Sequence, residues 1–284
     1  MIASPLRYPG GKAAMSGLLR QIRRLNGLAG SRMVEPFAGG AGASLRLLFL
    51  EETPSVAIND LDYGIHNFWW SLLNRPTGFL RLLRNRRVSM AEWRRQRTMY
   101  RKRGRLSRLE RGFATFYLNR CNRSGIVMNG GPIGGVKQDG RWKLDARFNK
   151  AELQRRCEKV VEYRDRIQLT CLDGIDLIRV MDERNNFLFI DPPYYVKGQT
   201  LYLNALTPEY HAGLASTLRS RTDAAWVVTY DDRPEIRAMY QGWSKIRPFT
   251  LRYVAAERER GREILITPRW LQLPISQPSA SISW

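Results

Sequence analysis

The most informative stretch of the sequence is VEPFAGGAGAS, at residues 34–44. A short apolar run leads into a glycine-rich turn, and the ASLRLLFLEE that follows has the apolar spacing expected of a helix. Gly39, Gly40 and Gly42 let a ligand approach the backbone closely, because side chains at these positions would collide with it. Taken alone, such a turn indicates a tight structural turn as readily as a binding site.

A second apolar run, SVAIND at residues 55–60, ends in Asp60. In nucleotide-binding α/β folds, an acid about 20 residues after the glycine-rich turn commonly binds ribose hydroxyls. The turn and Asp60 together therefore favour a cofactor that contains a nucleoside.

Further apolar runs predict the rest of a mostly parallel sheet. Their hydrophobicity is continuous rather than alternating, and helical stretches separate them, which is typical of strands buried on both faces. The predicted fold class is therefore α/β. We expect its strands within residues 32–40, 55–60, 167–173, 187–191, 225–230 and 263–267.

The segment 63–159 interrupts this rhythm and predicts an insertion. Its MAEWRRQRTMYRKRGRLSRLERGFATFYL run predicts two helices with a break near Gly104. Further along, KQDGRWKL at residues 137–144 contains an Asp-Gly turn between short candidate strands, which favours a β-hairpin. We therefore expect a discontinuous α/β domain at residues 1–62 and 160–270, an inserted domain at residues 63–159 and a Pro/Ser-rich tail at residues 271–284.

The strand expected at residues 187–191 leads directly into a DPPYY motif. Asp191 would lie at the carboxyl end of a buried strand, where open α/β sheets bind their ligands. Pro192 and Pro193 lack an amide hydrogen and stiffen the backbone, so carbonyl oxygens can face the cleft. Tyr194 offers a ring for stacking. Two acceptors beside an aromatic face suit a planar ring that bears an exocyclic amine.

The positive charge of the chain predicts an acidic partner. The 284 residues carry a formal net charge of +21. Between Arg75 and Arg111 there are 14 basic residues and two acids, a local charge of 14 − 2 = +12. So much uncompensated charge favours contact with nucleic acid over a merely solvated helix face. A membrane-surface helix is disfavoured, because the apolar residues of this segment are expected to enter a core.

The composition argues against several other classes of protein. A hydrophobic content of 43% is too high for a disordered chain. There is no run of about 18 apolar residues that would predict a membrane span, and the N-terminus lacks the apolar stretch of a signal peptide. The three cysteines are scattered without CxxC spacing, so we expect neither a disulfide scaffold nor a metal site.

A third motif, PLRYPGGK at residues 5–12, precedes the other two. PLRYPGGK, VEPFAGGAGAS and FIDPPYY in this order, with a long basic segment before the last, resemble the Dam-type (D12 class, α-group) DNA adenine N6-methyltransferases. FYLNRCNRSG, LTPEYHAGLASTL and AAERERGREILIT add weaker similarity. The resemblance spans residues 4–267 and implies a Rossmann-like methyltransferase sheet with an inserted helical and β-hairpin target recognition domain.

The resemblance implies S-adenosylmethionine as the cofactor. The glycine turn would hold its methionine part, the acid after the second strand its ribose and an acid after the next strand its adenine, while the N-terminal motif closes over the site. The cofactor-binding residues that the resemblance implies are Tyr8, Lys12, Glu35, Pro36, Phe37, Gly39, Gly40, Gly42, Asp60, Asp173 and Asp191. Asp176 lies close to Asp173 and competes with it for the adenine position.

The resemblance also implies methyl transfer to N6 of an adenine that has left the duplex, with Asp191, Pro192, Pro193 and Tyr194 as the catalytic residues. Asp191 and the Pro192 carbonyl would accept hydrogen bonds from N6, and Tyr194 would stack on the base. In SGIVMNGG, residues 124–131, an apolar residue stands at the family's usual arginine position, so we expect a recognition sequence other than GATC. The expected DNA-binding residues are Arg94, Arg95, Arg97, Arg101, Arg120, Arg123, Asn129 and Lys137.

Three alternatives stay open: RNA adenine methylation, cytosine N4 methylation and a non-catalytic DNA-binding relative. Intact Asp191, Pro192 and Tyr194 argue against the last, because a protein that only binds DNA has no use for them. We expect double-stranded DNA as the partner, no membrane, no metal, and a cytoplasmic protein of the bacterial nucleoid or of a phage-infected host. The sequence does not encode whether the enzyme is monomeric or whether it is paired with a restriction nuclease.

Overall fold

The computed structural model describes residues 3–7, 12–102, 106–195, 206–251, 262–275 and 282–283. Its centre is an eight-stranded sheet with the strand order β3-β2-β1-β4-β5-β7-β6-β8. The strands are β1 (Arg32–Glu35), β2 (Val56–Asn59), β3 (Ile167–Thr170), β4 (Asn186–Ile190), β5 (Ala225–Asp231), β6 (Ser244–Leu251), β7 (Arg262–Pro268) and β8 (Ile282–Ser283).

The first five strands in this spatial order are parallel, and β7, β6 and β8 are each antiparallel to their neighbours. The direction of winding reverses between β1 and β4. The crevice at the carboxyl ends of these two strands is therefore the topological switch point, where open α/β sheets bind their ligands. The α/β class predicted from the sequence is confirmed, and β6 and β8 are additions to the predicted strands.

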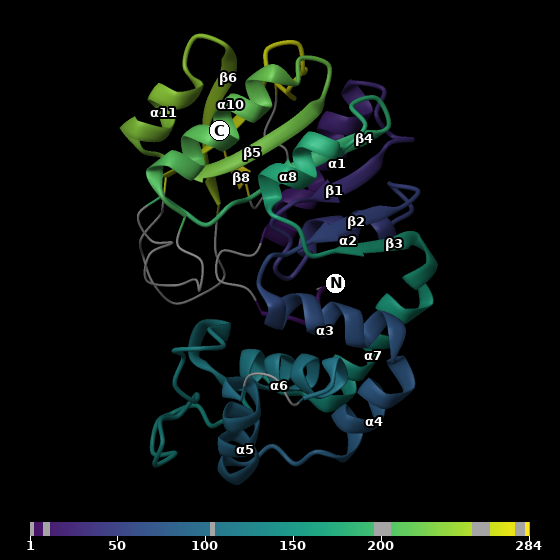
Figure 1. The fold of residues 1–284 in the computed structure, drawn as a ribbon, viewed down its shortest axis with the longest axis vertical. Coiled ribbons are helices and arrows are strands. Elements are labelled where there is room, and N and C mark those ends of the chain that lie inside the picture. The colour runs from purple at the N-terminus through teal and green to yellow at the C-terminus, as the bar shows by residue number, and fades with distance from the viewer. Residues whose placement is uncertain are drawn as a thin grey trace.

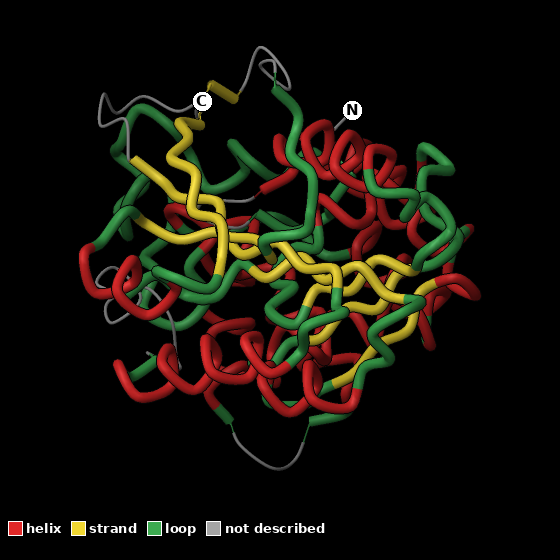
Figure 2. The backbone as a smooth tube through the Cα atoms, turned by 90° about the horizontal axis from the view of Figure 1, so that it is seen from above, coloured by secondary structure: helices red, strands yellow, loops and turns green. Residues whose placement is uncertain are grey.

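Helices cover both faces of the sheet (Figure 2). Their order along the chain begins with the short 3-10 helix η1 (Lys12–Met15) and continues with α1 (Ser16–Leu25), α2 (Gly42–Phe49), α3 (Tyr63–Asn74), α4 (Pro76–Asn85), α5 (Met90–Arg101), α6 (Arg108–Cys121), η2 (Arg123–Gly125), α7 (Lys150–Glu162), η3 (Arg164–Arg166), α8 (Gly174–Val180), α10 (Pro208–Ser220) and α11 (Pro234–Tyr240). None of these helices, within the part of the chain that is described, is long and apolar enough to cross a membrane.

Alternate residues of each central strand enter two different cores. In β4, Phe187 and Phe189 pack in the core that includes α1, α2 and α3, whereas Leu188 and Ile190 pack in the core that includes α8 and α10. All five residues of β4 are buried for this reason. The continuous apolar runs in the sequence therefore reflect burial on both faces, and a slip of one residue would exchange the two sets of side chains.

Helices α3–α7 gather beneath the sheet in Figure 1 and share one hydrophobic core with it. The rings of Phe68, Phe79, Phe113 and Phe116 pack with centroids 5.3–6.1 Å apart. Gly112 lets α3 and α6 approach closely, because a Cβ at that position would lie 2.3 Å from the carbonyl oxygen of Asn67. That this segment is a separate recognition domain stays a prediction.

The predicted break between the two basic helices is confirmed, although Gly104 itself lies outside the described residues. Helix α5 ends at Arg101, and α6 begins at Arg108. Ser107 caps α6 and accepts a hydrogen bond from the amide of Glu110, whose carboxylate bonds back to the Ser107 amide. This capping box satisfies two otherwise unpaired amides and so defines where the helix starts.

The hairpin predicted at residues 137–144 is not formed. The chain between η2 and α7 is described throughout and contains no strand; a single isolated bridge joins Asn122 to Pro132. The Gln138 side chain instead donates to the carbonyls of Ile133 and Gly135 and accepts from the amide of Leu144. These bonds supply partners that a strand ladder would otherwise supply, so the Asp-Gly sequence lies in a series of turns.

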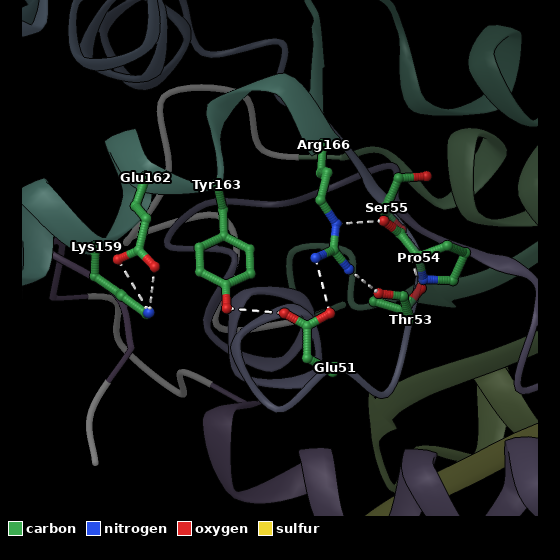
Figure 3. A network of polar contacts seen from close by, with 8 residues as sticks. All are labelled: Glu51, Thr53, Pro54, Ser55, Lys159, Glu162, Tyr163 and Arg166. Carbon is green, nitrogen blue, oxygen red and sulfur yellow. Dashed lines mark hydrogen bonds and ion pairs between the residues drawn. The ribbon is translucent and has the colours of Figure 1, made fainter.

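A polar network ties the return from α7 to the loop that precedes β2 (Figure 3). Arg166 donates to the carbonyls of Thr53 and Pro54 and to the carboxylate of Glu51, and the hydroxyl of Tyr163 donates to the same carboxylate. Each exposed ion pair is worth little. Together these bonds hold the amino ends of β2 and β3 side by side, at the opposite end of the strands from Asp60.

Candidate active site

The glycine-rich turn lies directly after β1, and Asp60 supports it. One carboxylate oxygen of Asp60 accepts the Gly39 amide at 2.8 Å, and the other accepts the Asp62 amide at 2.8 Å. Gly39 has a φ of +47°, a conformation that favours glycine. The indole of Trp69 also donates to the Gly39 carbonyl at 2.9 Å. The turn is thus held by a strand on one side and by α3 on the other.

Two buried acids flank this turn. Burial raises the pKa of Asp60 to about 7, even though backbone amides favour its ionised form. Burial likewise raises the pKa of Glu35 to about 7, and Glu35 accepts the Ser44 amide at 2.8 Å near the start of α2. Both carboxylates would be stabilised by a ligand that brings hydroxyl groups or positive charge into the crevice.

Asn59 joins the carboxyl ends of three strands. Its amide donates to the carbonyls of Pro36 and Leu172, at 2.8 and 2.9 Å. Its carbonyl oxygen accepts the hydroxyl of Thr170 and the amide of Leu172, each at 2.8 Å. With both polar atoms of Asn59 used, the loops after β1, β2 and β3 are held in one arrangement before any ligand arrives.

A third patch of the crevice lies at the start of α8. Asp173 caps this helix and accepts the amides of Ile175 and Asp176, while its other oxygen accepts the hydroxyl of Tyr210 at 2.8 Å. The ring of Phe37 packs directly on Gly174, where a Cβ would lie 2.4 Å from a ring atom. Asp176 is more exposed and pairs with Arg179, so Asp173 is the acid that the structure ties into the crevice.

The DPPY motif follows β4 on the opposite side of the switch point. Thr229, in β5, donates to Oδ1 of Asp191 at 2.5 Å, and the ammonium of Lys12 lies 3.8 Å from the same oxygen. Within the described residues, Oδ2 of Asp191 has no hydrogen-bond partner. Burial raises the pKa of Asp191 to about 6, whereas Lys12 and Thr229 lower it.

Lys12 links the N-terminal motif to the DPPY motif. Its ammonium donates to the Tyr194 hydroxyl at 2.7 Å and pairs with Glu263 at 2.5 Å. Tyr194 in turn donates to Glu263 at 2.9 Å. Tyr8, from the same N-terminal motif, lies outside the described residues. The structure brings Lys12, Tyr194 and Asp191 together through contacts that the sequence did not reveal.

Sequence reasoning missed Glu263, Thr229 and Tyr210. Glu263 carries a signal that could have been used, because it is an acid at the start of an apolar strand, just as Asp191 is an acid at the end of one. Thr229 lies inside an apolar strand and looks like a strand-forming residue. Tyr210 carries no signal of its own.

The predicted DNA-binding residues fall into two groups. Arg97 stacks on Trp93 at 5.2 Å from the ring centroid, and Arg120 is buried in α6 with 6% of its surface exposed. Arg120 is therefore buried, whereas Arg123, three residues later, is exposed. The exposed residues are Arg94, Arg95, Arg101, Arg123, Asn129 and Lys137.

Other reactive side chains take structural positions. His211 is buried, with Nδ1 2.7 Å from the Tyr230 hydroxyl. Cys121 and Cys157 are buried, and burial raises the pKa of each thiol to about 12. The described part of the chain holds no group of three or more His, Cys, Asp or Glu side chains that could bind a metal ion.

An open sheet of this strand order, with a glycine turn and a DPPY motif at its switch point, defines the class of the protein as a Rossmann-like methyltransferase fold. The chain belongs to the D12 class N6 adenine-specific DNA methyltransferase family, whose sequence model matches residues 8–258. It is an enzyme of adenine N6 methylation in DNA, as the three motifs predicted.

Solved structures with low sequence identity also resemble this chain. A conserved hypothetical protein from Streptococcus pyogenes is 9% identical with a TM-score of 0.35, and the match covers 89% of this chain and 96% of that one. The rRNA methyltransferase AviRa from Streptomyces viridochromogenes is 16% identical with a TM-score of 0.40, covering 92% and 86%. Comparison with curated proteins finds no match.

Proposed function

We propose that the enzyme uses S-adenosylmethionine to methylate N6 of an adenine flipped out of a short duplex motif. The observation that carries this proposal is Asp191, which is anchored through Oδ1 and leaves Oδ2 without a partner in the described chain, at the switch point opposite the glycine turn. A carboxylate held in this way is suited to accept a hydrogen bond from an amine that gains positive charge.

The residues around the glycine turn fit the proposed cofactor. Asp60 suits ribose hydroxyls, and Glu35 with the Gly39–Gly42 backbone suits the amino acid part. Both acids have raised pKa values, so a ligand that brings hydroxyl donors or an ammonium group relieves their burial. When bound, S-adenosylmethionine supplies an electrophilic methyl group on its sulfonium. Phe37 and Asp173 border the place proposed for its adenine, and Lys12 closes the site from the N-terminal motif.

The chemistry that remains for the chain is to make N6 nucleophilic. The lone pair of N6 is delocalised into the adenine ring, so the nitrogen must become more tetrahedral before it attacks. Asp191 Oδ2 and the Pro192 carbonyl would each accept one N6–H bond, which favours that geometry. The carboxylate then stabilises the positive charge that builds on N6. Pro193 stiffens the turn, and the Tyr194 ring stacks on the flipped base, worth about 1–3 kcal/mol.

The DNA surface that we propose centres on α5, α6 and the turns that follow. Arg120 is buried, and its Nε has no hydrogen-bond partner in the described chain. Burial, together with the nearby charges of Arg156, Arg7 and Arg147, lowers the pKa of Arg120 to about 9. Arg156 is already paired with Glu152, and Arg7 donates to the Asn122 carbonyl.

A buried guanidinium among other cations is costly unless an anion reaches it, and a DNA phosphate is the anion that this family's substrate offers. We propose that Arg120 binds such a phosphate. The exposed Arg94, Arg95, Arg101, Arg123, Asn129 and Lys137, with Arg97, would extend the contact along the duplex. Double-stranded DNA as the substrate implies work in the cytoplasm, in the nucleoid or in a phage-infected host.

The test is to incubate the enzyme with labelled S-adenosylmethionine and mixed plasmid DNA, and to map modified bases by single-molecule sequencing. We expect N6-methyladenine at one short motif other than GATC, and none with Asp191→Ala. Label that arrives only on RNA or on cytosine would contradict the proposal. DNA binding without any transfer would indicate a non-catalytic relative.

A further inference from the structure

Glu263 is a buried acid that lies outside the three sequence motifs. Only 3% of its surface is exposed. It belongs to β7, which runs antiparallel to β5, with Glu263 opposite Asp231. The first residues of β7 therefore lie at the same edge of the sheet as the last residues of β5. This reversal of direction brings a carboxylate to the DPPY motif from a distant part of the chain.

Glu263 joins Lys12 and Tyr194 into a closed triangle of contacts. Its Oε2 lies 2.5 Å from the Lys12 ammonium, and its Oε1 accepts the Tyr194 hydroxyl at 2.9 Å. Lys12 completes the triangle by donating to the Tyr194 hydroxyl at 2.7 Å. The Lys12 and Glu263 side chains are 3% and 4% exposed. Contacts shielded from water to this degree are screened little, so their charges act strongly on neighbouring groups.

The distances within this triangle show which carboxylate forms the ion pair with the Lys12 ammonium. The ammonium lies 2.5 Å from Glu263 but 3.8 Å from Asp191. With Glu263 present, the charges of Asp191, Glu263 and Lys12 sum to −1. Without Glu263 they sum to zero, and Lys12 offsets the carboxylate that faces the substrate. A nitrogen that becomes positive during reaction is stabilised by the first arrangement and not by the second.

We propose that Glu263 is a positioning residue for methyl transfer: it keeps the charge of Lys12 from neutralising Asp191 and fixes the hydroxyl of Tyr194. This inference rests on the proposed function, because it assigns Asp191 the developing charge on N6. Glu263 acts through Lys12 and Tyr194 and need not touch the base.

The groups that face Asp191 allow a pH test with a defined sign. Within the described residues they are Lys12 from η1, Glu35 from β1, Thr229 and Tyr230 from β5, and Glu263 from β7. Lys12 lowers the pKa of Asp191 and Glu263 raises it. Removing the negative charge of Glu263 therefore lowers the pKa of Asp191. The rate of methyl transfer, which needs Asp191 ionised, should then begin to rise at lower pH even though its maximum falls.

The experiment measures single-turnover transfer from labelled S-adenosylmethionine to duplex DNA, with enzyme in excess, across acidic and neutral pH. We expect Glu263→Gln to slow the maximal rate of the pH–rate profile by at least about tenfold. We also expect it to move the acidic limb of that profile, where the rate increases with pH, to lower pH. Glu263→Asp, which keeps the charge, should retain the wild-type limb. Glu235→Gln, an exposed acid on α11, is the matched control and should leave both quantities unchanged.

A double-mutant cycle with Lys12→Met isolates the charge effect. The combined Lys12→Met and Glu263→Gln variant should lose less activity than the product of the two single losses, because it again leaves Asp191 uncompensated. Thermal melting of each variant shows that the fold is intact. A lower rate with an unmoved acidic limb, or losses that multiply, would reduce Glu263 to a packing residue and overturn the inference.

The two proposals can fail separately. If the wild-type enzyme transfers no methyl group to DNA, the proposed function falls, and this inference falls with it. If the wild-type enzyme transfers methyl groups and Glu263→Gln transfers them equally fast at every pH, only the role of Glu263 is refuted.

Discussion

Asp191→Asn changes the proposed catalytic carboxylate with almost no change in shape. The amide oxygen would remain toward the Thr229 hydroxyl and Lys12, because both are donors and both face Oδ1 of Asp191. The amide nitrogen would then take the place of Oδ2. A donor would thus face the N6–H group, where the wild-type enzyme presents an acceptor.

Asp191→Asn loses the hydrogen bond that N6 donates to the carboxylate, and it loses the negative charge that stabilises N6 in the transition state. These two losses set the size of the effect. A hydrogen bond to a charged group contributes about 1.5–3 kcal/mol. Removing one preorganised group that stabilises transition-state charge costs about 2.7–4 kcal/mol. The two ranges describe overlapping effects, so we expect a loss of about 3–4 kcal/mol, which is roughly 10²–10³-fold in rate at about 1.4 kcal/mol per tenfold. Stability should not fall, because the variant removes a carboxylate whose pKa is raised by burial.

Single-turnover transfer to a methylatable duplex, with saturating cofactor and DNA, reports the chemical step directly. Equilibrium titrations with cofactor and with DNA should show that binding of each changes only slightly. Asp176→Asn makes the same chemical change on the exposed face of α8 and serves as the control. A rate for Asp191→Asn within about fivefold of wild type, with the fold intact, would refute the assignment of the developing charge to this carboxylate.

Four further outcomes are expected. The folded state raises the pKa of Glu35 from 4.5, and that of Asp60 from 3.8, to about 7. Between these ordinary and raised values the folded chain binds more protons than the unfolded one, so stability should decrease as the pH rises. Melting temperatures that increase with pH over this range would contradict the raised pKa values. Asp60→Asn should weaken cofactor binding by about tenfold or more in calorimetry, and unchanged binding would remove Asp60 from the site. Arg120→Met should raise the melting temperature yet weaken DNA binding and reduce its salt slope by about one; an unchanged slope would move the phosphate elsewhere. Gly174→Ala should destabilise the fold by about 1–3 kcal/mol in denaturant titrations, because the new Cβ would meet the Phe37 ring at 2.4 Å; a neutral result would show that the ring moves freely.

Much of the sheet could be predicted from the sequence, because each central strand is a local apolar run. The run ending at Asp191 and the run ending at Asp60 both mark the carboxyl ends of strands, and parallel pairing brings those ends to one edge. The segment 63–159 was harder to predict. Its helices follow from periodicity, but the side-chain bonds of Gln138 override the local hairpin signal in the turns that follow.

Local sequence was enough to show the resemblance to a methyltransferase family, through its three short motifs. It was also enough to place the acids that follow β2 and β4, since apolar runs and glycine turns are recognised within a few neighbouring residues. Only the tertiary structure decided that Glu263 lies at Lys12, because that contact depends on β7 running antiparallel to β5. The same holds for Arg120, which is buried while Arg123 is exposed. Helix packing, which involves residues far apart in the chain, decides which side of a helix faces the core, and local composition does not reveal it.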